Sequence, residues 1–420
     1  MEGTIASTDM RSFLCICLGV VIGASSCAAP TPSGPAFVLG AAIPSSGKQA
    51  KAGGFFKQGY ELAVQEANEN GGVSIGDGER LPVRLVLYDD KSDAATTVSL
   101  VERLITVDQV NALLSGYSTP LVQAQVVVPE KYGVPYLNAG GASKPIFKPD
   151  NRWIFGLLTP VEKLAETTMD WLAHEQEQGR LPRPTKIALV WQNTDHGREY
   201  RAGVQSSLLE YPGRFELTLD ESFEHLAKDH TALLIKVKVA GADVFLSDAH
   251  EPDYVLQHRA YVEQGLHHQV LSYGARGPEA SVRQALGGHV DYVVSAQWWS
   301  PALPYPQSQA FLRKFTETYG QEPTEYYPAL AYEAVRTLIA AVEDAGSLDR
   351  EAIRASLASI DLEDRLIPGQ RIRFSAENRF QIDNPCLIVQ NKPGGRVDII
   401  YPPDAATGEA VVPRPASTDR

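Results

Sequence analysis

The chain has 420 residues, of which 44% are hydrophobic, and its formal net charge is −13 at pH 7. This length is ample for a large core and favours more than one lobe. The acidic balance argues against nucleic acid as the partner, because phosphate binding needs a basic face.

The N-terminal region is typical of an export signal followed by a tether. Residues 13–22 form an apolar run after Arg11 that is shorter than the roughly 20 residues of a membrane span, so the run fits the hydrophobic part of a secretory signal. The stretch ASSC is similar to a bacterial lipobox, in which Cys27 receives a diacylglycerol group and becomes the first mature residue. We therefore expect a lipoprotein signal peptide over residues 1–26 and a Pro/Gly/Ser tether over residues 27–35. A plain secretory signal cut one or two residues later is the alternative.

Strand and helix patterns alternate through the next part of the chain. Apolar runs predict buried strands at 36–43, 81–88, 112–114 and 134–137, and helical spacing predicts helices at 53–68 and 94–107. This βαβαβ order favours a parallel sheet with helices on both faces.

The third and fourth of these strands each open into a loop of small residues, SGYSTP and NAGGAS. In an open parallel sheet, the loops at the carboxyl ends of strands are where a small ligand binds. Thr119 can cap the helix that Pro120 begins, and free amides would then face an anion such as a carboxylate. For either loop alone, an ordinary strand–helix turn is the alternative.

The alternation then restarts and predicts a second α/β lobe with a cleft between the two. Two late helices, at 307–319 and 329–344, most easily complete the first lobe, so the chain would cross between lobes more than once. The end of the chain is rich in Pro, Ala and Thr and lacks periodic apolar positions, which is typical of disorder. The expected parts are lobe 1 at 36–157 plus 298–364, lobe 2 at 158–297 plus 365–402, and a disordered tail at 403–420.

Motifs for covalent chemistry are missing from the sequence. It has no Gly-x-Ser-x-Gly elbow, phosphate-binding loop or His-Glu-x-x-His helix. Cys386 is the only cysteine of the body, so neither an internal disulfide nor a cysteine-based metal site is possible. We expect no cofactor and no metal.

Candidate ligand contacts lie at strand ends of the second lobe. His196 follows one strand, and the run His250, Glu251, Pro252, Asp253 follows another. A catalytic His–acid pair is conceivable, yet no Ser or Cys nucleophile stands in an activating context, so binding is favoured over catalysis. Of the adjacent pair Trp298 and Trp299, we expect one to pack inside a lobe and Trp299 to face the cleft.

At this point the residues resemble a known family. The stretches FVLGAAIPSSG, GYELAVQEANENGGV, VLYDDKSDAATTVSLVERLI and YGVPYLNAGGASKP are similar to amino-acid-type solute-binding proteins of ABC transporters, relatives of the leucine/isoleucine/valine-binding protein. The similarity continues over nearly all of residues 36–402. It implies a type I periplasmic-binding fold, with two Rossmann-like α/β lobes of parallel sheet, three crossovers and hinge closure around a ligand. It also implies delivery to a membrane permease without covalent chemistry.

Carried over position by position, the resemblance divides a ligand between the two lobes. Ser118 and Thr119 match the family's site for the ligand carboxylate. Around Ala142, Gly141 and Ser143 match the residues that give a carbonyl and a hydroxyl to the ligand ammonium.

On the other lobe, Asp253 matches the acid that pairs with the ammonium. There are departures: His196 stands where the family usually has Tyr, His250 and Glu251 replace small or aromatic residues, and Ala52 replaces an aromatic of some relatives. These departures favour a larger or more polar ligand than a simple branched-chain amino acid, including a cationic one.

The sequence thus predicts an exported, membrane-anchored lipoprotein facing the periplasm or the cell exterior. It would capture an amino acid or a related small carboxylate and deliver it to an ABC transporter permease. A ligand-sensing receptor of the same fold is the first alternative. An exported α/β hydrolase using His196 or His250 with Asp253 is the second.

Overall fold

The structure, a computed structural model, describes residues 34–76, 78–148 and 150–416, and the described residues from Ala36 onward form one compact unit. The predicted signal peptide, Cys27 and nearly all of the tether lie outside the described residues.

Lobe 1 contains a five-stranded sheet, all parallel, in the order β4-β1-β5-β6-β7. Its strand β1, which lies between β4 and β5, reads FVLGAAI and is buried along its whole length, as expected for a strand covered by helices on both faces. The strands are β1 (Phe37–Ile43), β4 (Val83–Asp89), β5 (Ala112–Leu114), β6 (Tyr136–Asn138) and β7 (Ile154–Gly156). The helices are α1 (Ala50–Glu69), α2 (Ala94–Thr106), α3 (Thr119–Gln125), α4 (Val127–Tyr132), α10 (Pro306–Tyr319), α11 (Tyr327–Ala345) and α12 (Arg350–Ser359). A small hairpin pairs β2 (Val73–Ser74) with β3 (Arg80–Leu81).

Lobe 2 contains a seven-stranded sheet in the order β14-β13-β12-β11-β10-β8-β9. The strands from β9 to β12 are parallel, and the last two pair antiparallel. The strands are β8 (Thr185–Gln192), β9 (Phe215–Phe223), β10 (Val244–Asp248), β11 (Val270–Ser272), β12 (Val294–Gln297), β13 (Leu387–Asn391) and β14 (Val397–Tyr401). The helices are α5 (Val161–Glu177), α6 (Asp195–Glu210), α7 (Thr231–Ala240), α8 (Glu251–Glu263) and α9 (Ala280–Leu286).

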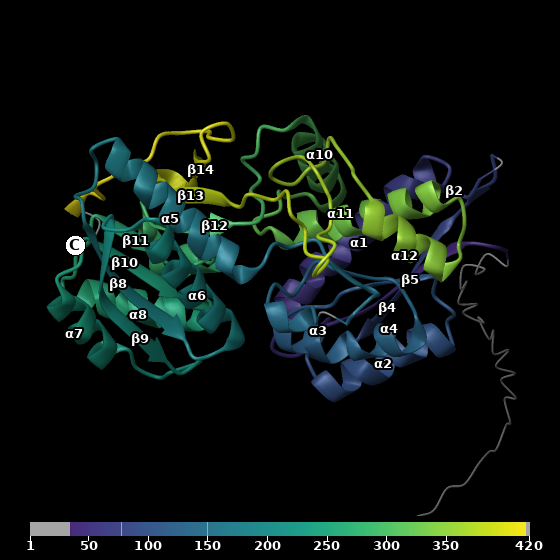
Figure 1. Ribbon diagram of the computed structural model, residues 1–420, viewed down its shortest axis with the longest axis horizontal. Helices are drawn as coiled ribbons and strands as arrows, with labels where there is room; N and C mark the ends of the chain where they lie inside the picture. The colour runs from purple at the N-terminus through teal and green to yellow at the C-terminus, as the bar shows by residue number, and fades with distance from the viewer. Residues whose placement is uncertain (1–33, 77, 149, 417–420) are drawn as a thin grey trace, which may run out of the picture. The chain divides into compact units, whose positions relative to one another are not determined.

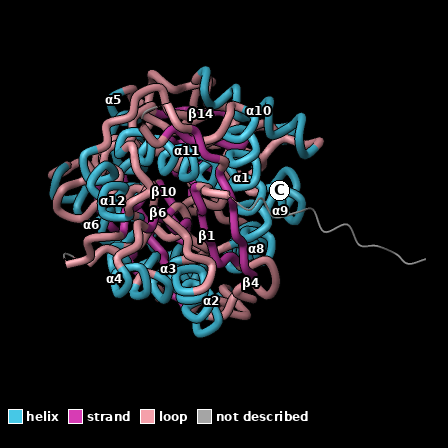
Figure 2. Tube along the Cα trace, turned by 90° about the vertical axis from the view of Figure 1, so that its right-hand side faces the viewer, coloured by secondary structure: helices cyan, strands magenta, loops and turns pink. Residues whose placement is uncertain are grey.

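Each sheet lies between two layers of helices (Figures 1 and 2). In lobe 1, α2, α3 and α4 bury one face of the sheet, and α1 and α11 bury the other. In lobe 2, α7, α8 and α9 bury one face, and α5 and α6 the other. The two Rossmann-like lobes predicted from the sequence are therefore confirmed.

The chain passes between the lobes three times, after β7, after β12 and before β13. The third passage comes later than the sequence predicted at residue 365. Phe374 packs its ring on Phe155 at 5.4 Å, and Phe380 packs on Phe147 at 4.0 Å. These aromatic contacts keep the segment up to residue 382 on lobe 1.

The predicted disordered tail is wrong over residues 403–416, which pack on lobe 2. Ala405 is fully buried, the Val411 N–H donates to Gln390 Oε1 at 2.9 Å, and the Arg414 N–H donates to the Gln269 carbonyl at 2.8 Å. The composition of the tail could not predict these hydrogen bonds, because their partners lie elsewhere in the sequence.

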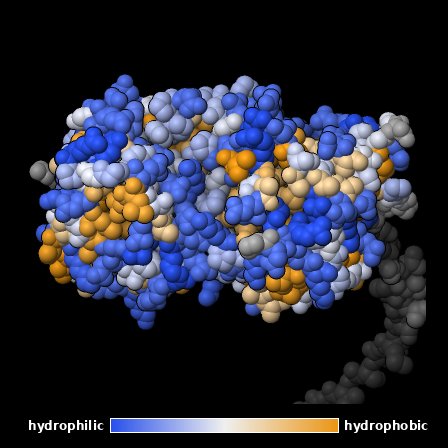
Figure 3. Space-filling view, in the orientation of Figure 1, coloured by the Kyte–Doolittle hydropathy of each residue, from blue (hydrophilic) through white to orange (hydrophobic). Residues whose placement is uncertain are grey.

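The visible face of the molecule is mostly hydrophilic, with apolar patches such as one over α7 (Figure 3). Ile235 and Val239 on that helix are 53% and 82% exposed. Among the described residues, no helix combines the length and the apolar character that a membrane crossing requires.

Candidate ligand-binding site

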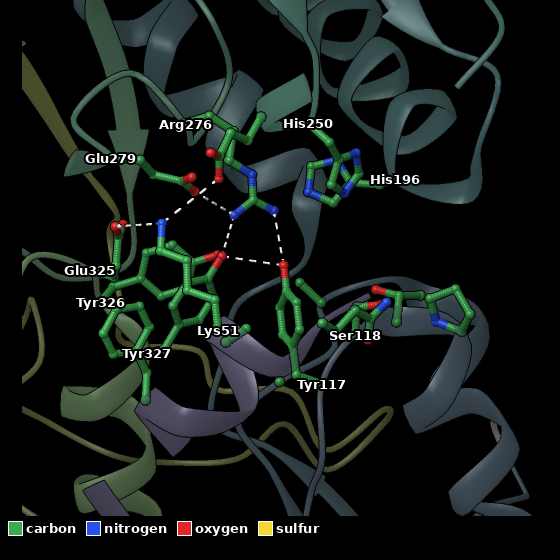
Figure 4. A pocket seen from close by; sticks show the side chains of 18 of the residues that line it. Lys51, Tyr117, Ser118, His196, His250, Arg276, Glu279, Glu325, Tyr326 and Tyr327 are labelled. Carbon is green, nitrogen blue, oxygen red and sulfur yellow. Dashed lines mark hydrogen bonds and ion pairs between the residues drawn. The ribbon is translucent and has the colours of Figure 1, made fainter. Parts of the chain in front are cut away.

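A cavity of about 630 Å³ is lined by loops from both lobes at the carboxyl ends of their strands (Figure 4). Its size falls within the range of small-molecule sites. Ser118, Thr119, Ala142, His196, His250 and Glu251, which the sequence analysis assigns to the ligand, line this cavity.

The loop after β5 presents hydroxyls to the cavity. Ser118 Oγ accepts a hydrogen bond from Gln49 Nε2 at 2.9 Å, so its own proton is left to donate. The structure puts Ser118, and not Thr119, at the N-cap of α3, and its side chain makes no capping bond. Because α3 has only seven residues, an anion here would be held by the hydroxyls of the loop and not by the helix N-terminus.

The loop after β6 contributes Ala139, Gly140 and Ala142 to the cavity wall, whereas Gly141 and Ser143 are not among the described lining residues. The Gly141 carbonyl accepts from Asn138 Nδ2 at 2.5 Å. Ser143 Oγ is buried and has no hydrogen-bond partner among the described residues. The two positions assigned by resemblance to the ligand ammonium are thus turned into the lobe.

Asp253 is fully buried and is also absent from the described wall of the cavity. Its carboxylate accepts from the N–H groups of Leu226 at 2.9 Å and Ala227 at 3.1 Å, and from Gln192 Nε2 at 2.7 Å. Burial alone would raise the pKa of Asp253, but hydrogen bonds led by that from His230 outweigh it and lower the pKa. The carboxylate organises the loop after β9 and is not itself on the described wall of the cavity.

Three imidazoles, of His196, His225 and His250, line lobe 2 of the cavity. The His250 ring lies 5.6 Å from that of His196 and 5.3 Å from that of His225. His196 Nδ1 lies 2.9 Å from Asp248 Oδ2. Burial, followed by the charges of Arg276 and the two neighbouring histidines, holds the pKa of His250 well below its usual range, so the ring is neutral.

The tautomer of His250 follows from Asp253. Because the Gln192 amide nitrogen donates to Asp253, its Oε1 is directed at His250 Nδ1, which must carry the proton of that hydrogen bond. Nε2 of His250 is then a hydrogen-bond acceptor.

Arg276 is the main wall residue that sequence reasoning missed. It follows β11 and is only 7% exposed. Nη1 donates to Glu279 Oε1 at 2.9 Å and to the Tyr327 hydroxyl, and Nη2 donates to the Tyr117 hydroxyl at 3.3 Å (Figure 4). A cation in the Gly-Ala-Arg-Gly loop at a strand end was the only sequence signal.

Aromatic side chains form much of the remaining wall, and most were also missed. Tyr117 and Tyr327 lie 5.1 Å apart, centroid to centroid, and Trp298 packs 5.3 Å from Tyr326. The structure places Trp298 on the wall, whereas Trp299 is buried with Nε1 donating to Ser308. Their helical and loop positions gave no indication of which ring faces the cleft.

Each acidic side chain of the described wall has a basic partner. Lys51 Nζ lies 3.8 Å from Glu251 and 3.7 Å from Glu325. Burial raises the pKa of Glu325 to about 8, so this carboxyl is mostly protonated at neutral pH. Asp195 pairs with Arg198 at 2.6 Å, and Glu279 pairs with Arg276. No group of His, Cys, Asp and Glu among the described residues is placed to hold a metal ion.

The two lobes touch around the cavity. Lys51 Nζ of α1 donates to Ser281 Oγ of α9 at 2.8 Å, and Gln123 Nε2 donates to Asp195 at 3.4 Å. A solute held in the cavity would therefore contact both lobes at once.

A family model described as "Periplasmic binding protein" matches residues 37–396. The chain belongs to the periplasmic binding protein family. The Leu/Ile/Val-binding protein homolog 7 of Brucella abortus is 23% identical to it over 395 residues, covering 92% of this chain and 96% of the relative.

Solved structures of this family share the fold. The branched-chain amino acid transporter substrate-binding protein LivJ of Streptococcus pneumoniae, in complex with isoleucine, has a TM-score of 0.73 at 21% identity, covering 90% of this chain and 100% of that one. A solute-binding protein of an ABC transporter from R. palustris, in complex with benzoate, has a TM-score of 0.70 at 20% identity, covering 90% and 98%.

These findings confirm the resemblance seen in the sequence. The chain is a substrate-binding protein of the ABC transporter type, and the family is extracytoplasmic. Members of this family are not enzymes, which rules out the hypothesis of an exported hydrolase.

Proposed function

We propose that this periplasmic binding protein captures an amino acid or a related small carboxylate between its lobes and delivers it to an ABC transporter permease. The observation that carries this proposal is the cavity between the lobes, with the hydroxyls of Ser118 and Thr119 on its wall.

The physics of this wall suits a carboxylate. A hydroxyl that donates to an ionised oxygen makes a charge-assisted hydrogen bond, which is roughly twice as strong as a neutral one. Closing the lobes removes water from the cavity, and electrostatic interactions strengthen as the local dielectric constant falls. Isoleucine and benzoate, the ligands of the two similar proteins, share only a carboxylate as a charged group in common, which supports that group as the constant end.

We further propose that the protein is a lipoprotein anchored through Cys27. The lipobox-like ASSC and the tether composition support this anchor. Expression of Cys27→Ser in a bacterial host should release the protein from the membrane fraction, whereas the parent stays with the membranes. Release of both forms would contradict the anchor.

The test of the binding function is a thermal-shift screen of the purified protein over amino acids, amides, polyamines and aromatic acids. A ligand that binds only the folded state raises the melting temperature in a concentration-dependent manner. We expect hits among carboxylates. Hits confined to polyamines or neutral amides would contradict the proposal.

An uptake assay with the permease distinguishes the transport hypothesis from the hypothesis of a ligand-sensing receptor. Membrane vesicles that contain the cognate permease and its ATPase should take up the bound solute only when this protein is added. Ligand binding without stimulated uptake would favour the receptor hypothesis.

A further inference from the structure

We infer that the ligand is a carboxylate without an ammonium group, and that Arg276 is the residue that discriminates against amino acids. This inference rests on the proposed function and narrows its ligand class.

The groups that the resemblance assigns to a ligand ammonium are missing from the described cavity wall. The Gly141 carbonyl, the Ser143 hydroxyl and the Asp253 carboxylate were assigned to the ammonium, and all three lie off the described wall of the cavity. Gly141 and Asp253 are engaged by donors from within their own lobes. By contrast, Ser118 and Thr119, which were assigned to the carboxylate, both line the cavity. The described cavity wall therefore keeps the residues assigned to the carboxylate of an amino acid and lacks those assigned to its ammonium.

The wall carries a guanidinium close to the proposed carboxylate site. Arg276 is almost entirely buried on the cavity wall. It lies beside the carboxylate loop, because its Nη2 donates to the hydroxyl of Tyr117, the residue before Ser118. Nη1 of Arg276 is paired with Glu279, so Nη2 is the side of the guanidinium that faces this loop, where a second positive charge would be repelled. An ammonium next to the bound carboxylate would meet this repulsion.

The acids that do line the cavity are engaged by basic side chains of the protein. Asp195, Glu251 and Glu279 each pair with a base. Glu325 also lies near Lys51, and it is mostly protonated at neutral pH. Within the described residues, no acid of the wall is left to a cationic ligand.

The remaining wall indicates the body of the ligand. Phe55, Tyr117, Tyr327 and Trp298 offer apolar ring surface, which suits an aromatic or other unsaturated skeleton. Nε2 of the neutral His250 can accept a hydrogen bond from a ligand hydroxyl. The ligand class is therefore an unaminated, ring-bearing carboxylate, with or without a hydroxyl.

Isothermal titration calorimetry with matched pairs tests this inference. The pairs are 3-phenylpropionate with L-phenylalanine, 4-methylpentanoate with L-leucine, and 4-methylbenzoate with 4-(aminomethyl)benzoate. Within each pair that binds, we expect the unaminated acid to bind at least tenfold more tightly. Equal or tighter binding of the aminated member overturns the inference and leaves the proposed function intact. If no carboxylate binds at all, the proposed function itself fails.

Variants then test the role of Arg276. Arg276→Gln should reduce the tenfold preference to threefold or less, and Arg276→Lys, which keeps the charge, should retain it. Arg283→Gln is the matched control, because Arg283 lies on α9, contacts the Gly395 carbonyl and is not a lining residue. A full preference in folded Arg276→Gln, or a preference lost in Arg276→Lys and Arg283→Gln alike, would overturn the assignment to Arg276.

Discussion

At the scale of single residues, the structure changes the meaning of Asp253. The resemblance assigned Asp253 to the ligand. In the structure its carboxylate accepts hydrogen bonds from the loop after β9 and from the side-chain amide of Gln192. Through Gln192 it fixes which nitrogen of His250 carries the proton. Asp253 is then a positioning residue that reaches the cavity through two other side chains.

Asp253→Asn should lower stability by about 1.5–3 kcal/mol at pH 7, the usual worth of a hydrogen bond to a charged group. Because the pKa of Asp253 is lowered in the folded state, its contribution is full above the unfolded value near 4 and is lost as the pH falls through the folded value. Urea unfolding at pH 7 and at pH 3 measures this, and the gap from the parent should shrink at pH 3.

The matched control is Glu263→Gln, an exposed carboxylate on the same helix α8. It should leave stability within about 0.5 kcal/mol at both pH values. A gap for Asp253→Asn that stayed constant from pH 7 to pH 3 would show that the charge of Asp253 is not what matters.

At the scale of elements, periodicity and strand-end loops located most of the sheet and helix order. The sequence could not show which side chains at a strand end face the cleft, because that depends on how each loop turns after the strand. Ser118 lies on the wall. Ser143, which the sequence assigned to the ligand, does not, whereas Arg276, which the sequence did not single out, does. The same limit applies to residues 403–416, whose hydrogen bonds are made to distant partners.

Helix α6 carries Glu199, which contacts the other lobe. Its Oε1 accepts from the Lys144 N–H at 3.0 Å, and its Oε2 is buried without a hydrogen-bond partner among the described residues. Burial raises the pKa of Glu199 to about 8. Since a raised carboxyl pKa favours the protonated form, its contribution to stability falls as the pH rises from about 4.5 toward 8.

Glu199→Gln should therefore stabilise the protein at pH 8.5 by on the order of 1 kcal/mol. This allows for the partial exposure of the group, which screens its charge. At pH 5 the variant and the parent should differ little. Thermal unfolding at both pH values measures the difference, with the exposed Glu210→Gln on the same helix as control. A stabilisation that is equal at pH 5 and pH 8.5 would contradict the role of ionisation.

Truncation after residue 402 tests the packing of the C-terminal segment. It removes the Val411 and Arg414 N–H bonds, the Glu409 carbonyl that accepts from Lys392 Nζ, and the buried Ala405. At about 1 kcal/mol for each hydrogen bond, we expect a loss of roughly 3 kcal/mol and a lower melting temperature by calorimetry. An unchanged melting temperature would restore the prediction of a disordered tail.

At the scale of the whole molecule, three passages of the chain join two lobes that share one cavity. Lobe 1 supplies the hydroxyls suited to a carboxylate, and lobe 2 supplies a guanidinium and imidazoles. The first contribution could be predicted from the sequence, because Ser118 and Thr119 lie in the strand-end loop after β5. The imidazoles of His196 and His250 could also be predicted, because both residues follow strands of lobe 2. The guanidinium could not, because no sequence pattern shows that the buried Arg276 lines the cavity and that the buried Asp253 does not.

The most direct test of the account is calorimetric titration of Ser118→Ala and Ser143→Ala with the carboxylate that binds the parent most tightly. The sequence assigned both serines to the ligand, whereas the structure leaves only Ser118 on the described wall. Ser118→Ala should weaken binding by about 1.5–3 kcal/mol, or roughly 10- to 150-fold, because it removes a donor to a charged group. Ser143→Ala should change the affinity by less than about threefold. Unchanged affinity in Ser118→Ala, or a larger loss in Ser143→Ala, would contradict the carboxylate site.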